Sequence, residues 1–74
     1  MDVTVNGKPR TLAGDMTVGQ LLESLQVVPE RVVVEVNLNI LKRAQHPQTM
    51  LHEGDHVEIV QLIGGGAWPK ISSS

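Results

Sequence analysis

The first twelve residues alternate between apolar and polar positions. Met1, Val3 and Val5 are separated by polar residues, a period that is typical of a half-buried strand. The next two residues, Asn6-Gly7, are the strongest short signal for a hairpin turn. We therefore expect residues 8–12 to fold back as a second, antiparallel strand.

After residue 16 the apolar period lengthens from two to between three and four residues. Thr17 and Gln20 have the spacing of a capping box, which predicts a helix that begins here. Gly19 weakens this helix by up to about 1 kcal/mol relative to Ala, so tertiary packing must hold it. Pro29 is expected to end the helical region. The apolar stripe that packs on a sheet consists of Val18, Leu21, Leu22 and Leu25.

Residues 32–36 are rich in β-branched side chains and predict a strand with two unlike faces. The face formed by Val32, Val34 and Val36 is apolar, and Val33 and Glu35 lie on the other. The segment Asn37-Leu38-Asn39 is interpreted as a tight turn in which Asn39 is able to take the left-handed conformation, followed by a short strand at Ile40-Leu41.

Residues 42–53 contain Pro47 and scattered polar groups, so we expect a loop with one short turn, anchored in the core by Leu51. Val57 and Ile59 then alternate with Glu58 in a last strand, over residues 56–62.

This order of elements predicts an α+β domain, in which one helix covers one face of a mixed sheet of four or five strands. The helical crossover allows the first and last strands to lie parallel and adjacent in the middle of the sheet, which is the β-grasp arrangement.

Composition narrows the class of protein further. The chain of 74 residues allows one domain, and the absence of cysteine excludes disulfides and thiolate metal sites. A net charge of −2 and a single aromatic residue, Trp68, argue against binding to nucleic acid. No signal peptide or membrane-spanning run is visible, so a small soluble cytoplasmic domain is expected. We expect no metal site at His46, His52 and His56, because a glycine and an aspartate interrupt the helical spacing of the last two.

Two further features bear on function. If the helix covers the face that includes Val57, then Val33, Val60 and Leu62 point to the opposite face, as a partner-binding patch or as ordinary surface aliphatics.

Beyond the last strand, Gly64, Gly65 and Gly66 form a leash without side chains, suited to a narrow channel or to a plain linker. Residues 67–74 lack periodicity and are expected to be a disordered extension, in which Trp68 is either a recognition anchor or an exposed side chain.

Several of these segments resemble one family when they are taken together and in order. They are Val5-Asn6-Gly7-Lys8, Thr17-Val18 with Leu21-Leu22, Val34-Glu35-Val36-Asn37, Gly54-Asp55 with Val57-Glu58-Ile59-Val60, and Gly65-Gly66. Over residues 1–66 the chain resembles the ubiquitin-like sulfur carriers of thiamine biosynthesis, the ThiS family.

The resemblance implies a carrier protein, and not an enzyme, whose working group is the terminal carboxylate of Gly66, with Gly65 and Gly64 as its leash. A ThiF-type adenylating enzyme, which itself uses ATP and Mg²⁺, would activate this carboxylate. A sulfur donor such as a cysteine desulfurase would convert it to a thiocarboxylate, and a ThiG-type thiazole synthase would receive the sulfur. No cofactor is expected on the carrier itself, which has no phosphate-binding motif.

Two departures from the family accompany the resemblance. The chain continues for eight residues past Gly66, so either a protease removes residues 67–74 or the carrier chemistry has been lost. The reactive end is then Gly66, or alternatively Gly65. The family usually turns through Asn-Gly where this chain has Asn37-Leu38. The rival functions are a sulfur carrier for molybdopterin or another metabolite, and a noncovalent β-grasp binding module.

Overall fold

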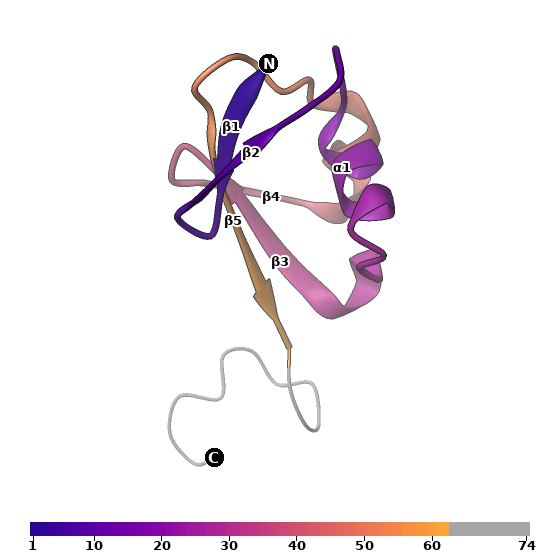
Figure 1. The fold of residues 1–74 in the computed structure, drawn as a ribbon. Helices are drawn as coiled ribbons and strands as arrows, with labels where there is room; N and C mark the ends of the chain where they lie inside the picture. The colour runs from indigo at the N-terminus through magenta and orange to yellow at the C-terminus, as the bar shows by residue number, and fades with distance from the viewer. Residues whose placement is uncertain (63–74) are drawn as a thin grey trace.

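The computed structural model describes residues 1–62, which form a five-stranded mixed sheet with one α-helix against one face (Figure 1). Two short 3₁₀-helices, η1 and η2, complete the described part. In chain order the elements are β1 Asp2–Val5, β2 Lys8–Thr11, α1 Val18–Ser24, η1 Pro29–Arg31, β3 Val32–Val36, β4 Asn39–Leu41, η2 Arg43–Gln48 and β5 His56–Gln61.

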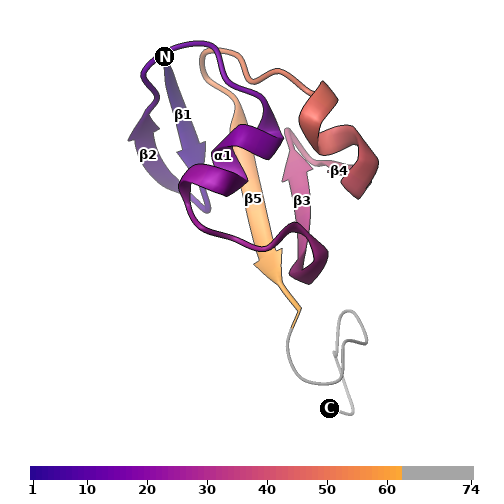
Figure 2. The same ribbon diagram turned by 90° about the vertical axis from the view of Figure 1, so that its right-hand side faces the viewer.

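The strands lie in the order β2-β1-β5-β3-β4, so that β5 is the central strand. β1 and β5 run parallel, with Thr4 opposite His56, and the other neighbouring strands are antiparallel. Figure 2 shows α1 lying across one face of the sheet, in front of β5. The predicted β-grasp fold, with the first and last strands parallel and adjacent, is confirmed.

Helix α1 begins and ends with local hydrogen-bond motifs. The Gln20 backbone N–H donates to Thr17 Oγ1 at 3.1 Å, and the Thr17 N–H donates to Gln20 Oε1 at 2.9 Å, which confirms the predicted capping box. At the other end Gln26 has a φ of 59°, its N–H donates to Glu23 O, and the Val27 N–H donates to Leu22 O. This pair of bonds is a Schellman motif, in which the left-handed position is usually glycine.

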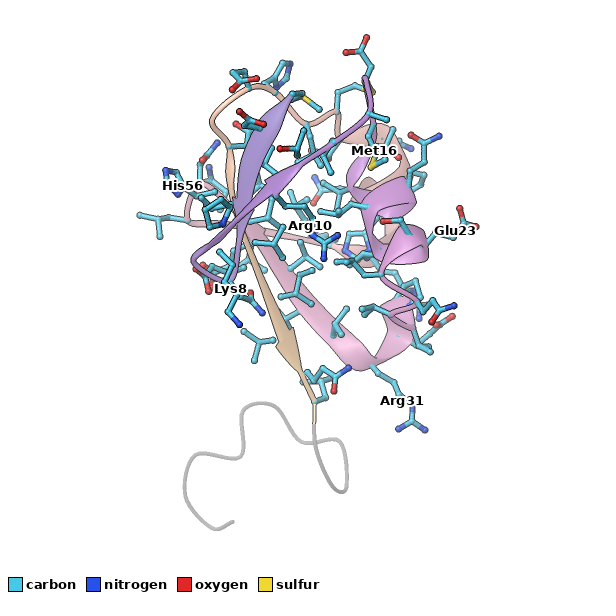
Figure 3. All side chains as sticks on the ribbon, viewed as in Figure 1. Lys8, Arg10, Met16, Glu23, Arg31 and His56 are labelled. Atoms are coloured by element: carbon cyan, nitrogen blue, oxygen red, sulfur yellow. The ribbon has the colours of Figure 1, made fainter. Side chains whose placement is uncertain are left out.

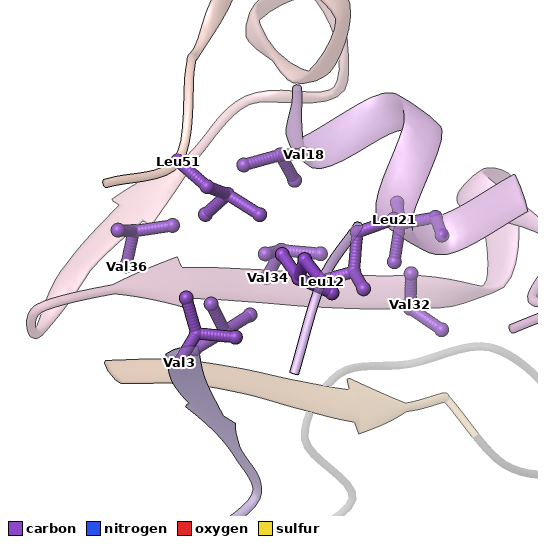
Figure 4. Packing of buried hydrophobic residues seen from close by; sticks show 10 residues of the cluster. Val3, Leu12, Val18, Leu21, Val32, Val34, Val36 and Leu51 are labelled. Carbon is purple, nitrogen blue, oxygen red and sulfur yellow. The ribbon is translucent and has the colours of Figure 1, made fainter. Parts of the chain in front are cut away.

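The hydrophobic core lies between α1 and the sheet (Figure 4). Val18, Leu21 and Leu22 of the helix are fully buried against Val34 of β3 and Val57 of β5. β3 alternates between buried and half-buried residues along its whole length, as its period predicted. The remaining buried apolar residues are Val3, Leu12, Val32, Val36 and Leu51.

The turn between β3 and β4 differs from the prediction. Asn37 and Leu38 have positive φ values of 51° and 72°, whereas Asn39 pairs with Val36 as the first residue of β4. The predicted left-handed conformation of Asn39 is therefore wrong. The physical reason is that residues 37 and 38 are the central residues of a type I′ hairpin turn, which requires positive φ at both of them.

The loops contain more regular structure than predicted. Pro29 does more than end the helical region, because it opens η1, where its fixed φ suits the first position. In place of one short turn, η2 spans six residues and contains Pro47. Leu51 is buried, as expected for its anchoring role. No helix within residues 1–62 is long and apolar enough to cross a membrane, and a cytoplasmic location stays a prediction.

Candidate functional site

The candidate site is the end of β5 and the sheet face around it. Leu62, the last described residue, donates its backbone N–H to Arg31 O at 2.8 Å, so the chain is bonded up to this point to the residue that precedes β3. The glycines predicted to form the leash and reactive end, Gly64, Gly65 and Gly66, lie outside the described residues, as do Trp68 and the extension 67–74. Their roles stay predictions.

Asn6 fixes one side of β5. Its backbone N–H donates to Val57 O at 2.8 Å, and its side-chain Oδ1 accepts the Ile59 N–H at 2.7 Å. The Asn6 Nδ2 group also donates to Ile59 O at 3.2 Å. β1 ends at Val5, so the Asn6 side chain continues the pairing with β5 in place of a strand backbone. Sequence reasoning assigned Asn6 only to the hairpin turn and missed this role.

Asn37 fixes the other side of β5, near its start. Its N–H donates to His56 O at 2.8 Å, and its Oδ1 accepts the His56 N–H at 3.0 Å. Its Nδ2 donates to Asp55 Oδ1 at 3.0 Å, while Asp55 Oδ2 accepts the His52 N–H at 2.8 Å. Both sides of β5 are therefore held in the sheet.

The predicted partner-binding residues lie on the face of the sheet opposite α1. Val33 and Val60 are directly opposite each other in the β3–β5 register, and Val60 is 36% exposed. Leu62 follows Val60 by two residues and is half-buried. The structure therefore brings Val33 and Val60 together, with Leu62 beside the chain exit. The patch formed by these three residues is called the exit patch below.

The same face carries residues that sequence reasoning did not assign to a site. A hollow of about 420 Å³ is lined by Asn37, Leu38, His56 and Glu58. Figure 3 shows His56 on the side of the sheet away from Glu23 of α1. Thr4 Oγ1 lies 2.9 Å from His56 Nδ1, within hydrogen-bond distance. The one sign of this region in the sequence was Leu38, which stands where the family usually has glycine in the turn.

The three histidines have separate environments. His46 lies in η2 and is buried, and no partner in the described part of the chain reaches its Nδ1 atom. Burial, and secondarily the charge of Arg43, lower the pKa of His46 below its usual value. Within residues 1–62 no three His, Asp or Glu side chains gather in a group that could hold a metal ion.

A β-grasp sheet with one covering helix, whose central strand is followed in the sequence by a glycine run, has the architecture of the ubiquitin-like proteins. The ThiS family model matches residues 3–66 of this chain. The chain belongs to the ThiS family, as the sequence resemblance predicted, and two relatives of matching length are named sulfur carrier proteins.

Relatives of similar length support this assignment. The sulfur carrier protein ThiS of Thermus thermophilus is 38% identical over 64 residues, which cover 86% of this chain and 98% of the relative. The ThiS protein of Escherichia coli is 30% identical and is covered completely. The crystal structure of the thiamine biosynthesis protein ThiS from Geobacter metallireducens has a TM-score of 0.78 and 42% identity, and covers 89% of this chain and 100% of its own.

Two longer relatives match only in part. Thiazole synthases from Paramagnetospirillum magneticum and Magnetococcus marinus are 40% and 36% identical to this chain. The chain spans about a fifth of the length of these two proteins, whereas they match 90% and 99% of the chain. A sequence of this kind therefore occurs within longer chains named thiazole synthase.

Proposed function

We propose that this protein is a sulfur carrier of thiamine biosynthesis whose working group is the carboxylate of Gly66. In the first step a carboxylate oxygen attacks the α-phosphorus of ATP in a ThiF-type adenylating enzyme, and pyrophosphate leaves. Sulfur from a cysteine desulfurase, at the oxidation level of sulfide with the help of a thiol reductant, then displaces AMP from the carbonyl carbon. The resulting thiocarboxylate donates its sulfur to the thiazole ring.

The observation that carries this proposal is the fixed position of β5 directly before the glycine run. Asn6 and Asn37 hold the strand on its two sides, and the Leu62 N–H bonds to Arg31 O. An activating site has to hold the carboxylate away from water, and a glycine end enters such a site without a Cβ atom. A sheet whose last strand is held in place, followed by glycines without side chains, is suited to delivering the carboxylate into such a site.

Family membership supports the pathway and the partners. Three proteins of matching length are named as sulfur carriers or as a thiamine biosynthesis protein, which favours thiazole formation over molybdopterin synthesis. Longer relatives are named thiazole synthase, which favours that enzyme as the sulfur acceptor. The exit patch of Val33, Val60 and Leu62 is the proposed docking surface for the adenylating enzyme. A processing protease would first remove residues 67–74.

The test compares three lengths of the chain with a purified ThiF-type enzyme, ATP and Mg²⁺. The version ending at Gly66 should release pyrophosphate and, with the sulfur donor, gain the mass of one oxygen exchanged for sulfur. The intact chain should do neither, and the version ending at Gly65 tests which glycine is reactive. Equal activation of the intact chain, or no activation of either shortened version, would contradict the proposal.

A further inference from the structure

The turn between β3 and β4 presents an apolar side chain in an unfavourable position. Leu38 has a φ of 72° and is 86% exposed. A bulky residue rarely adopts positive φ, and glycine or asparagine normally occupies such turn positions. Leu38 therefore strains the backbone and gains no burial within residues 1–62. A contact with another molecule would account for a leucine at this point.

The surroundings of Leu38 form a concave, partly apolar surface on the sheet face opposite α1. Leu38 lines the hollow of about 420 Å³ together with His56 and Glu58. Ile40, two residues further on, is 64% exposed and lies opposite Glu35 in the β3–β4 register. This surface, defined by Leu38, Ile40, Glu35 and Glu58, is called the turn surface below.

Charge restricts what can cover the turn surface. Glu35 and Glu58 are directly opposite each other in the β3–β5 register, a placement in which like charges repel. Within residues 1–62 the oppositely charged side chains within 4 Å of each other are Arg43–Glu30 and, when His52 is protonated, His52–Asp55, so neither carboxylate has a cationic partner there. A second copy packed by a two-fold axis would add two more carboxylates. The complementary occupant is one that presents a basic group.

The position of the turn surface indicates the size of this occupant. The β3–β4 turn lies beside the start of β5, and the chain exit follows the end of that six-residue strand. The two regions are therefore about 20 Å apart. A folded protein with a standard-sized interface can contact both at once.

We infer that the turn surface binds a protein partner that places an arginine or lysine against Glu35 and Glu58 and encloses Leu38 in an apolar pocket. The inference rests on the proposed function and identifies the partner as thiazole synthase. This enzyme is chosen because related sequences occur within longer chains of that name. The turn surface adds a second contact, distant from the reactive end, and this contact selects the acceptor enzyme.

The experiment measures the Kd of the full chain for a purified thiazole synthase, at about 50 mM and about 200 mM NaCl. Leu38→Gly should weaken binding about tenfold while the melting temperature is kept or raised, since glycine accepts the positive φ. The double variant Glu35→Gln/Glu58→Gln should also weaken binding and reduce its salt dependence. Glu23→Gln on α1 removes one carboxylate from the opposite side and should change neither property.

The outcomes separate this inference from the proposed function. Unchanged Kd values for both turn-surface variants would overturn the inference, while conversion of the wild-type chain to a thiocarboxylate would still support the carrier function. Weaker binding to the ThiF-type enzyme, with binding to the synthase unchanged, would overturn the choice of partner. A wild-type chain that neither binds the synthase nor accepts sulfur would overturn the proposed function, and the inference with it.

Discussion

The side-chain amide of Asn6 bonds to both backbone groups of Ile59, a residue 53 positions further along the chain. The amide oxygen accepts the Ile59 N–H at 2.7 Å and the amide nitrogen donates to Ile59 O at 3.2 Å. An asparagine side chain contains the same donor and acceptor as a peptide group. Asn6 can therefore turn the backbone into the hairpin and still bond to β5 like a strand residue.

Replacing Asn6 by glycine should separate these two roles. Glycine adopts the positive φ of this position, so the variant loses only the two bonds to Ile59. We expect a loss of about 1–2 kcal/mol in the free energy of unfolding, measured by urea denaturation. Asn39→Ala is the control, because its side-chain bond to Asn37 O is long, at 3.4 Å. Equal losses in the two variants would contradict the role of Asn6.

Gln26→Gly should stabilise the protein. Gln26 ends α1 with a φ of 59°, a conformation that costs an L-residue about 1 kcal/mol, whereas glycine adopts it freely. Part of this gain is offset by the greater freedom of glycine in the unfolded chain, so an increase of about 0.5 kcal/mol is expected in thermal or urea unfolding. Glu23→Gly, three residues earlier within the helix, should change stability by a similar amount in the opposite direction. Destabilisation by both variants would contradict this interpretation of the helix end.

The stability of the fold should decrease in mild acid because of His46. Burial and the nearby Arg43 lower the pKa of His46 in the folded protein, so the unfolded chain binds the proton more readily. The contribution of His46 to stability is therefore complete above about pH 6.5 and is lost as the pH falls from there toward the lowered pKa. His46→Leu should make the melting temperature less dependent on pH between about 7.5 and 5.

The control for His46 is Gln48→Leu, at an exposed, uncharged side chain of the same 3₁₀-helix. It should retain the wild-type dependence of melting temperature on pH. The Nδ1 atom of His46 has no partner within residues 1–62, so its removal breaks no hydrogen bond there. A pH profile of His46→Leu that matches that of the wild type would assign the acid sensitivity to other groups.

Val60→Asp should weaken binding to the ThiF-type enzyme about tenfold or more and leave the fold intact. Val60 lies on the face opposite α1, beside Val33, and is 36% exposed, so a carboxylate there stays in contact with water until a partner covers it. The binding is measured by titration calorimetry and the fold by circular dichroism. Val28→Asp makes the same change at an exposed valine ahead of η1 and should leave binding unchanged. Equal Kd values for wild type and Val60→Asp would place the docking surface elsewhere.

Local patterns in the sequence predicted most of the fold. The Asn6-Gly7 turn, the Thr17 capping box and the alternation over residues 32–36 each depend on neighbours in sequence, and each is confirmed. The same period of two correctly placed Val33 and Val60 on one face. These features could be predicted because short-range sterics and hydrogen bonds determine them.

Features that depend on the tertiary arrangement could not be predicted in this way. The bonds from Asn6 to Ile59 exist only because β1 and β5 are neighbours, and nothing in the Asn6-Gly7 dipeptide indicates them. The turn surface depends on the register that places Glu35 opposite Glu58. Gln26 occupies a position where glycine is the usual signal, so its left-handed conformation had no sign in the sequence.

The order of the strands also affects how the protein folds while it is being synthesised. The β1–β2 and β3–β4 hairpins share no backbone pairing in the sheet except through β5, whose residues are the last of the described strands to be synthesised. In a nascent chain that stops before residue 56, the backbone groups on the inner edges of β1 and β3 are therefore unpaired. Chaperones or other chains can bind to these edges. The sheet can therefore be completed only after β5 has been synthesised and has left the ribosome.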